Sequence, residues 1–223
     1  NISDQNVAKK RRNSSSFINS VNISVNSNMF PIIHRLQNTI VMDIKLNGFQ
    51  KLNSILSFKD PENLKEKKFS EYLSEITPKI LKKISDIIEN NGGEIVKYND
   101  YEFTTIWNYS CTKDFTKIRQ NKKFYAKHAI LTAVQIMKYV DKTEIACGVH
   151  LKVSIGIATG EAAIVFFGGE RKRSEYVVMG ESIERAENCL NYSLSHKIII
   201  SKELNNLFSG SNEIRTKPLE NDL

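Results

Sequence analysis

The chain has 223 residues, 40% of them hydrophobic and 26% charged, which is the balance of a globular protein with one α/β domain or one domain with tails. Its net charge of +7 favours a polyanionic partner, and nucleic acid, a membrane surface and a nucleotide all fit that sign. The cysteines Cys111, Cys147 and Cys189 are widely spaced without a CxxC pair. This spacing argues against a disulfide framework and a zinc site, and it indicates a reducing compartment.

The chain carries no sign of a membrane segment. No apolar run approaches the roughly 20 residues that a membrane-spanning helix needs, and no signal-peptide pattern is present. We therefore expect a cytoplasmic domain. Because the chain begins at Asn1 rather than Met, we also expect a longer parent, which could be membrane-associated.

The first part of the chain predicts an arm followed by a buried strand. Residues 1–34 are rich in Asn and Ser without sustained periodicity, so we expect a linker or disordered arm. A short apolar run over residues 39–42 ends on Asp43 and predicts a buried strand. The segment 47–56 is expected to start a helix capped by Asn47.

A long amphipathic helix is predicted over residues 64–90. Pro78 should bend this helix, and Gly92-Gly93 should end it. The next stretch, "GGEIVKYNDYEFTTIW" over residues 92–107, predicts a β-hairpin. The apolar residues of the helix recur at spacings of three and four on one face: Phe69, Leu73, Ile76, Ile80, Ile84, Ile87 and Ile88.

The second half of the chain predicts one more long helix and several strands. Residues 110–123 are polar and basic, which favours a loop, and the helix is expected over residues 124–140. Residues 149–160 alternate between apolar and polar and predict a half-buried strand. Further strands are expected in "EAAIVFFGG" and "SEYVVMG", then a helix from about Glu181, a last strand and a short helix.

The predicted order of elements is β-α-β-β-α-β. This is the ferredoxin-like arrangement, in which two helices pack on one face of an antiparallel-rich sheet. We therefore predict an α/β (α+β) domain over residues 35–209, followed by a tail over residues 210–223.

Two acids fall where this topology can bring them together. Asp43 ends the first strand, and Asp100 lies at the turn between the second and third strands. Because the first and third strands are neighbours in such a sheet, both positions lie at one edge. Two carboxylates there repel each other unless a cation lies between them, and Mg²⁺ suits a nucleoside triphosphate substrate. Acids at strand ends are also common, and Asp100 fits a simple turn equally well.

Three longer motifs point to one family. They are "IVMDIKLNGFQKL", "GGEIVKYNDYEFTTIW" and "SIGIATGEAAIVFFGGERKRSEYVVMGESIERAENCL". Together, over roughly residues 36–208, they resemble the class III nucleotide cyclases, and within these the first catalytic half of soluble-type adenylyl cyclases. The combination is specific, although no single motif is.

The resemblance implies a cyclase domain that works in a head-to-tail pair with a second cyclase catalytic domain. Such a pair converts ATP to cyclic AMP and pyrophosphate by attack of the ribose 3′-oxygen on the α-phosphate, with two Mg²⁺ or Mn²⁺ ions. By position, Asp43 corresponds to the first metal aspartate, and Ile44 to a residue whose backbone carbonyl helps to hold a metal. The phosphate-facing loop corresponds to Leu46, Asn47, Gly48 and Phe49.

The chain departs from the family pattern in three places. The loop after Asp43 is two residues longer than usual. Counted without a gap, the second metal position falls on Tyr101, and only a local shift at the turn would bring Asp100 into place. Glu184 and Asn188 replace the Asn and Arg that stabilise the transition state. This half therefore has no such catalytic residue, and the chain alone should be inactive.

Lys97 is the candidate for an anion site. In soluble-type enzymes a pseudo-symmetric second site binds bicarbonate through a Lys and an Arg. Lys97 corresponds to the Lys, but the Arg position falls on Glu187, which would repel an anion, so bicarbonate binding is doubtful. A partly buried structural lysine paired with an acid explains Lys97 equally well.

We therefore expect an enzyme, adenylate cyclase (a phosphorus–oxygen lyase), acting as one half of a paired site. The alternative is a catalytically silent regulatory domain that pairs with and positions an active partner, which Tyr101 and the longer loop favour. Nucleic-acid binding is disfavoured, because the basic residues lack interleaved aromatics on a sheet face. The four histidines, His34, His128, His150 and His196, show no metal-ligand spacing.

Overall fold

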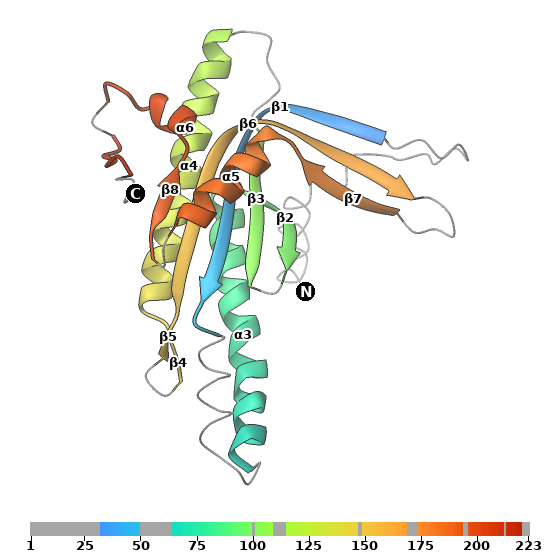
Figure 1. The fold of residues 1–223 in the computed structure, drawn as a ribbon, viewed down its shortest axis with the longest axis vertical. Helices are drawn as coiled ribbons and strands as arrows, with labels where there is room; N and C mark the ends of the chain where they lie inside the picture. Colours follow the sequence, from blue (N-terminus) through green and yellow to red (C-terminus); the bar gives the residue numbers. More distant parts are fainter. Residues whose placement is uncertain are drawn as a thin grey trace, which may run out of the picture.

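One antiparallel-rich sheet with helices on both faces organises the chain (Figure 1). The computed structural model describes residues 32–49, 64–99, 101–108, 115–146, 149–168, 174–193, 196–211 and 213–219. Its strands are β1 (Ile32–Asn47), β2 (Glu94–Asn99), β3 (Glu102–Asn108), β4 (Glu144–Ala146), β5 (Val149–His150), β6 (Lys152–Gly168), β7 (Ser174–Met179) and β8 (Ile198–Ile200). Its helices are α3 (Leu64–Asn90), α4 (Phe115–Asp141), α5 (Glu181–Tyr192) and α6 (Lys202–Asn206).

The order of the strands confirms the predicted ferredoxin-like α/β (α+β) class. The main sheet runs β2-β3-β1-β6-β7, and β8 adds to β6 in parallel. β1 lies between β3 and β6 and pairs antiparallel with both. The two short strands β4 and β5 form a separate ladder. The first and third strands are therefore neighbours, as expected.

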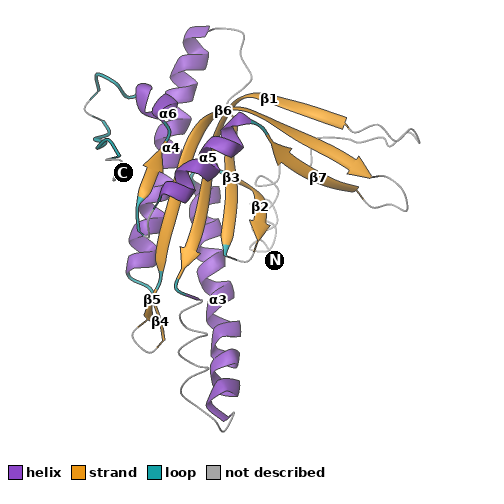
Figure 2. Ribbon diagram, in the orientation of Figure 1, coloured by secondary structure: helices purple, strands orange, loops and turns teal. Residues whose placement is uncertain are grey.

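Helices α3 and α4 cover one face of the sheet (Figure 2). From α3, Ile80, Ile84 and Ile88 enter the main core at a spacing of four, which is one face of a helix. They pack with Met42 and Ile44 of β1 in the same core. The predicted helix over residues 64–90 and the hairpin that follows it are thus confirmed, with Pro78 inside α3.

Helix α5 covers the opposite face of the sheet. Its Ala186 is buried in a second core with Val41, Ile106 and Ala158, which come from three adjacent strands. Glycine at position 156 makes this packing possible, because a Cβ there would lie 2.3 Å from the Ala186 carbonyl oxygen and from the Leu190 nitrogen. The backbone of α5 therefore lies directly on β6.

Several predicted boundaries were wrong. β1 runs from Ile32 to Asn47, so Asp43 lies inside the strand and not at its end. α4 begins at Phe115, nine residues before the predicted helix and within the predicted loop. The strands predicted over residues 149–160 and in "EAAIVFFGG" form one continuous strand, β6, from Lys152 to Gly168. The segment 50–63 and the charged turn 169–173 lie outside the described residues.

The prediction that the alternating segment forms a half-buried strand was also wrong. Val153, Ile155 and Ile157 face the main core as expected, but Ser154 and Ala158 on the other side are buried too. Helix α5 covers that side, and a small residue at every second position leaves room for it. The small and polar residues that alternate with the apolar ones in β6 therefore allow a helix to pack closely and are not exposed to solvent.

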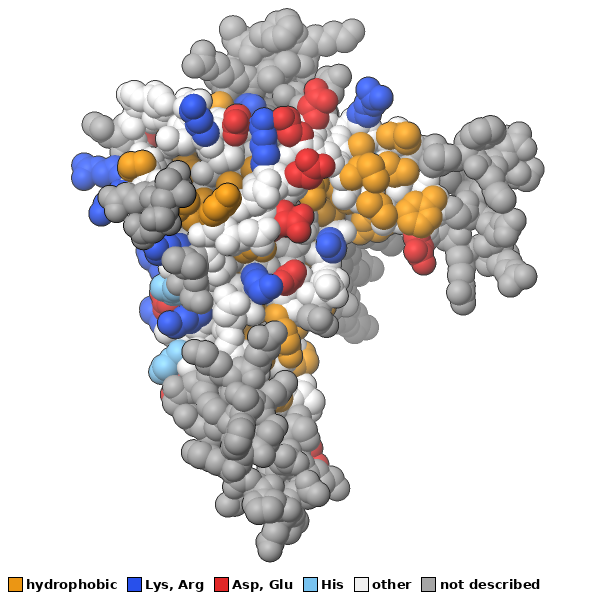
Figure 3. All heavy atoms as spheres, viewed as in Figure 1, with side chains coloured by type: hydrophobic (Ala, Val, Ile, Leu, Met, Phe, Trp, Pro, Cys, Tyr) orange, Lys and Arg blue, Asp and Glu red, His pale blue; other side chains and the backbone are white. Residues whose placement is uncertain are grey.

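The strands β1, β6 and β7 continue beyond the rest of the sheet as an arm (Figure 1). In the arm, Ile33 pairs with Val165, and Val165 pairs with Val177, so these three side chains share one face. Ile33, Phe167, Val177 and Met179 are exposed on this face. Figure 3 shows apolar side chains gathered over the arm.

None of the helices in the described part of the chain is both long and apolar enough to cross a membrane.

Candidate active site

Asp43 occupies the middle of a row of residues that crosses four strands. It pairs with Thr104 of β3 on one side and with Gly156 of β6 on the other. Thr104 in turn pairs with Lys97 of β2. Since paired residues point to the same face of a sheet, Lys97, Thr104 and Asp43 all point toward the side that α5 covers.

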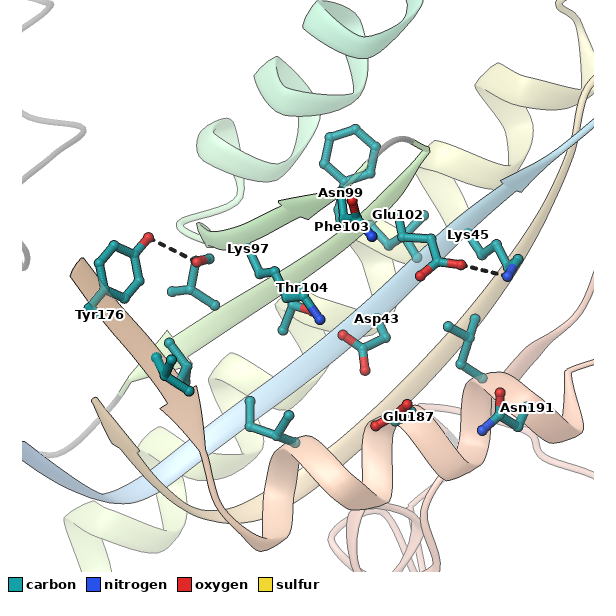
Figure 4. A pocket seen from close by; sticks show the side chains of 16 residues that line it. Asp43, Lys45, Lys97, Asn99, Glu102, Phe103, Thr104, Tyr176, Glu187 and Asn191 are labelled. Atoms are coloured by element: carbon teal, nitrogen blue, oxygen red, sulfur yellow. Dashed lines mark hydrogen bonds and ion pairs between the residues drawn. The ribbon is translucent and has the colours of Figure 1, made fainter. Parts of the chain in front are cut away.

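A cavity of about 560 Å³ lies over this row, bordered by α5 and β7 (Figure 4). Tyr176 of β7 lines the cavity, and its hydroxyl donates a hydrogen bond of 2.9 Å to the carbonyl oxygen of Val96 in β2. The cavity therefore joins β1, the β2–β3 hairpin and the consecutive elements β7 and α5. Its polar lining residues are Asp43, Lys45, Lys97, Asn99, Glu102, Thr104, Tyr176, Glu187 and Asn191.

Asp43 is a buried carboxyl group without a full set of partners. Its side chain is 7% exposed, and its Oδ1 accepts no hydrogen bond from the described residues. Burial raises the pKa of Asp43 to about 6. A hydrogen bond from the Thr104 side chain lowers this pKa, while the charge of Glu187 raises it. The charge of Lys97 also lowers this pKa, but Asp43 forms no ion pair with the described residues.

The charges around Asp43 are unevenly matched. Lys45 forms an ion pair of 2.5 Å with Glu102, in the next row toward the hairpin turn. Lys97 and Glu187 line the same cavity and form no ion pair with the described residues. Within the described residues, no group of three or more His, Cys, Asp and Glu side chains is arranged to hold a metal ion. Further oxygen ligands would have to come from the backbone, water or a substrate.

Comparison with known protein families decides the identity of the fold. Residues 38–221 match the family model of the adenylate and guanylate cyclase catalytic domain. The chain belongs to this family. The resemblance to the nucleotide cyclases that the three motifs indicated is therefore confirmed. No curated protein sequence matches this cyclase domain.

Solved cyclase structures share the fold of this domain. The adenylyl cyclase CyaB from P. aeruginosa is 20% identical, with a TM-score of 0.58 over 79% of this chain and 82% of that chain. The guanylate cyclase domain of RhGC from Catenaria anguillulae, solved in complex with GTP, is 14% identical, with a TM-score of 0.58 over 79% of this chain and 85% of that chain. The guanylyl cyclase Cya2 is 20% identical, with a TM-score of 0.56 over 78% and 79%.

The cyclase domain keeps Asp43 at the floor of the cavity, but the predicted phosphate-facing loop lies elsewhere. Leu46 and Asn47 are strand residues, paired with Val153 and Lys152, and neither lines the cavity. Leu46 is buried in the main core. These two residues thus lie in a strand and not in a loop, and their role beside a phosphate stays a prediction. Pairing continues past Asp43 because both neighbouring strands continue beside it.

The rest of that stretch is held by local packing. Gly48 has φ +125°, a conformation that favours glycine, and a Cβ there would lie 3.3 Å from the His150 carbonyl oxygen. Phe49 is buried and stacks on Tyr101, with ring centroids 4.1 Å apart and planes 7° apart. Ile44 is fully buried and its side chain packs in the main core. The metal role of its backbone carbonyl stays a prediction.

The hairpin leaves the second metal position open. Asp100 lies outside the described residues. Tyr101, which the gapless count puts at the metal position, packs its ring on Phe49 and the main core, away from the Asp43 cavity. Tyr101 therefore contributes to the packing of the hairpin, and its side chain offers no ligand to this cavity.

The replaced catalytic positions lie apart from Asp43. Glu184 borders a second cavity of about 490 Å³ with Arg35, at the junction of the arm and α5. Asn188 is exposed on α5 and lines neither cavity. Residues at these two positions would thus act at a surface other than the Asp43 cavity of the same chain.

Sequence reasoning missed the immediate neighbours of Asp43. Lys45 was not assigned to the site, although strand alternation was a usable signal, because Lys45 lies two residues after Asp43 on the same face. Tyr176 offered no such signal, since only the curl of the sheet brings β7 over the hairpin. Lys97 is exposed and unpaired among the described residues, so the partly buried, paired lysine of the alternative prediction is not found.

Proposed function

We propose that this cyclase domain is the metal-donating half of an adenylyl cyclase. It pairs with a second cyclase domain, and the pair converts ATP to cyclic AMP and pyrophosphate. The observation that carries this proposal is the buried, unpartnered Oδ1 of Asp43 at the floor of a cavity of about 560 Å³. A cavity of this size accommodates a bound small molecule.

The ligands around Asp43 fit a hard divalent cation. The available donors are carboxylate and carbonyl oxygens, which Mg²⁺ and Mn²⁺ prefer. Asp43 would hold the ions, with the Ile44 carbonyl and Asp100 as further ligands. When bound, the two ions would neutralise the triphosphate and acidify the ribose 3′-hydroxyl. The 3′-oxygen then bonds to the α-phosphorus, and the bond from that phosphorus to pyrophosphate breaks.

Pairing is supported by what the Asp43 cavity lacks. Stabilising the charge that develops at the α-phosphate needs a donor aimed at it. Glu184 and Asn188 replace the family Asn and Arg, and neither lines this cavity. The missing donors would therefore come from the second domain, and this chain alone would be essentially inactive.

The exposed face of the arm supports the same conclusion. Ile33, Phe167 and Val177 form an exposed apolar surface on the arm, and Val177 also lines the cavity. A contiguous exposed apolar surface beside a binding cavity is typical of a protein interface. We propose the second cyclase domain as its occupant.

The choice of ATP rests on the resemblance to soluble-type adenylyl cyclases. The similar structures include an adenylyl cyclase and guanylyl cyclases, all below 25% identity, so they do not select the base. Lys97 and Glu187 line the cavity together, so an anion such as bicarbonate would meet a carboxylate as well as an ammonium group. Bicarbonate activation is therefore not part of the proposal.

A second candidate function is a silent regulatory domain that positions an active partner. It is favoured by one observation: Tyr101 is committed to its stack on Phe49 and offers no metal ligand to the cavity. In this case the pair would form cyclic AMP only at a site built by the partner domain.

The test is co-expression of this chain with its second-half domain, followed by measurement of cyclic AMP and cyclic GMP with Mg²⁺ or Mn²⁺. We expect cyclic AMP, and loss of at least about 100-fold with Asp43→Ala, since removing a metal carboxylate removes transition-state stabilisation. Asp86→Ala, an exposed acid on α3, is the control and should leave activity unchanged. Full activity of the Asp43→Ala pair would support the silent domain, and cyclic GMP as the product would correct the substrate.

A further inference from the structure

The crossing point of α5 on the sheet fixes which residues of the helix face Asp43. A Cβ at Gly156 would lie 2.3 Å from backbone atoms of Ala186 and Leu190, so this turn of α5 makes the closest approach to β6. Asp43 is the direct neighbour of Gly156 in the adjacent strand. The turn of α5 from Ala186 to Leu190 therefore lies beside the Asp43 carboxyl group.

Glu187 is the acidic residue of that turn. It lines the same cavity as Asp43, and Figure 4 shows its side chain on α5 facing the Asp43 side chain on β1. Glu187 is exposed and forms no hydrogen bond or ion pair with the described residues. Two acids that form no ion pair with the described residues thus face one another, one on the sheet and one on the helix.

The other acid in the described part of the cavity is already neutralised. Glu102 is paired with Lys45 at 2.5 Å. Tyr101, at the expected second metal position, points to the main core and stacks on Phe49. The described residues therefore offer Glu187 as the acid that is free to share a cation with Asp43.

The neighbouring side chains favour a hard cation over a soft one. The described residues that line the cavity include carboxylates and amides but no thiol, and Cys189 of the same helix is not among them. Carboxylates with backbone or water oxygens suit Mg²⁺ and Mn²⁺. Lys97 also lines the cavity, and its positive charge would weaken the binding of a cation there.

We propose that Glu187 is a carboxylate ligand of the divalent-cation site, holding the ion together with Asp43 from the opposite side of the cavity. This helix residue would act in addition to the hairpin acid Asp100, which lies outside the described residues. This assignment deepens the proposed function and rests on it for Mg²⁺ as the biological ion. Its geometric basis is the close packing of α5 on β6 at Gly156, which is the neighbour of Asp43 in β1.

The test measures Mn²⁺ binding to the full chain without nucleotide, by electron paramagnetic resonance of the free ion. Glu187→Gln should weaken binding by about tenfold or more, as loss of a ligand does, and Asp43→Asn should abolish it. Lys97→Gln should strengthen binding, because it removes a positive charge from the cavity. Glu184→Gln is the matched control: it lies on the same helix, borders the other cavity and should bind as the unaltered chain does.

Several outcomes would overturn the proposal. One is unaltered Mn²⁺ affinity in Glu187→Gln, and another is an unaltered chain that binds no Mn²⁺ at millimolar concentration. A tenfold loss in Glu102→Gln with none in Glu187→Gln would assign the second carboxylate to β3. Circular dichroism of each variant checks that its fold is retained.

The cyclic AMP assay separates this proposal from the proposed function. Mn²⁺ binding that needs Glu187, without any cyclic AMP from the pair, would refute the cyclase half and leave the cation site standing. Cyclic AMP formation that is unchanged by Glu187→Gln would leave the cyclase half standing and refute the role of Glu187.

Discussion

Asp43 combines burial with an unpartnered oxygen. It is 7% exposed, and its Oδ1 accepts no hydrogen bond from the described residues. Leaving such a group ionised in the folded chain costs free energy unless a cation is bound. The same side chain thus destabilises the metal-free domain and equips it to bind a cation.

This cost predicts how stability depends on pH. The pKa of Asp43 is about 6 in the folded chain, against 3.8 as the ordinary value. The folded state therefore binds the proton more tightly, and stability falls as pH rises from about 4 to about 6. The pKa difference corresponds to at most about 3 kcal/mol at pH 8.

Asp43→Asn should therefore change the free energy of unfolding of the metal-free domain more favourably at pH 8 than at pH 4. Urea denaturation in EDTA at several pH values measures the difference in free energy of unfolding. Saturating Mg²⁺ should narrow this difference at pH 8, because the ion stabilises only the chain that binds it. If Asp43→Asn changed the free energy of unfolding by the same amount at every pH, the pKa of Asp43 would not be raised in the folded chain.

At the residue scale, sequence reasoning found Asp43 but not its surroundings. Asp43 was predictable because an apolar strand run ends on it within a family motif. Glu187 was recognised only as an acid at the position of a family arginine, because its approach to Asp43 depends on how α5 crosses the sheet. The ring of Tyr101 packs on Phe49, and no local pattern predicts that stack.

At the scale of elements, α5 is the part of the fold that builds the site. It carries Glu187, closes the cavity over β1 and covers the second core. Glycines at two positions of β6 face it. A Cβ at Gly156 would lie 2.3 Å from backbone atoms of α5, whereas a Cβ at Gly160 would lie 3.3 Å from the Ser182 nitrogen.

These two glycines give a graded prediction. Gly156→Ala should reduce the free energy of unfolding by about 3 kcal/mol or more, because a backbone clash forces α5 off the sheet. Gly160→Ala, on the same strand and facing the same helix, should change it by only about 1 kcal/mol. Chemical denaturation of both variants tests this. Equal changes in the free energy of unfolding for the two variants would mean that α5 can shift on the sheet. Gly156 would then not fix the position of Glu187.

Helix periodicity predicted α3 well, because Ile80, Ile84 and Ile88 mark one buried face. The same reasoning failed on β6, where small residues under α5 were taken for an exposed face. It also started α4 nine residues late, since the first turns of that helix are polar and basic. Local sequence patterns show which face of a helix or strand is buried, but they do not show whether another element will cover its opposite face.

At the scale of the whole molecule, the arm is the feature without a function inside the chain. Its face with Ile33, Phe167 and Val177 is exposed, while its other face packs in the second core through Leu36 and Ile164. Order of strands and fold class were predictable from the sequence of elements. The length of the arm was not, because the beginning of β1 lay within the predicted linker.

Phe167→Glu should weaken pairing with the second cyclase domain by about tenfold or more, since aromatic residues dominate interface energies. Leu131→Glu on α4 is the matched control, because both side chains are 44% exposed. Neither change should alter the stability of the isolated chain greatly. Sedimentation of mixed domains measures the affinity, and equal behaviour of the two variants would exclude the arm from the interface.

The most direct measurement titrates the purified chain into a fixed amount of its second-half domain, with ATP and Mg²⁺, and follows cyclic AMP. We predict no product from the chain alone, and a rate that rises and saturates at one chain per partner. The Asp43→Ala chain should compete with the unaltered chain for the partner yet give no product. Full activity of the Asp43→Ala pair would contradict the account, because the cavity beneath α5 would then not be the catalytic metal site.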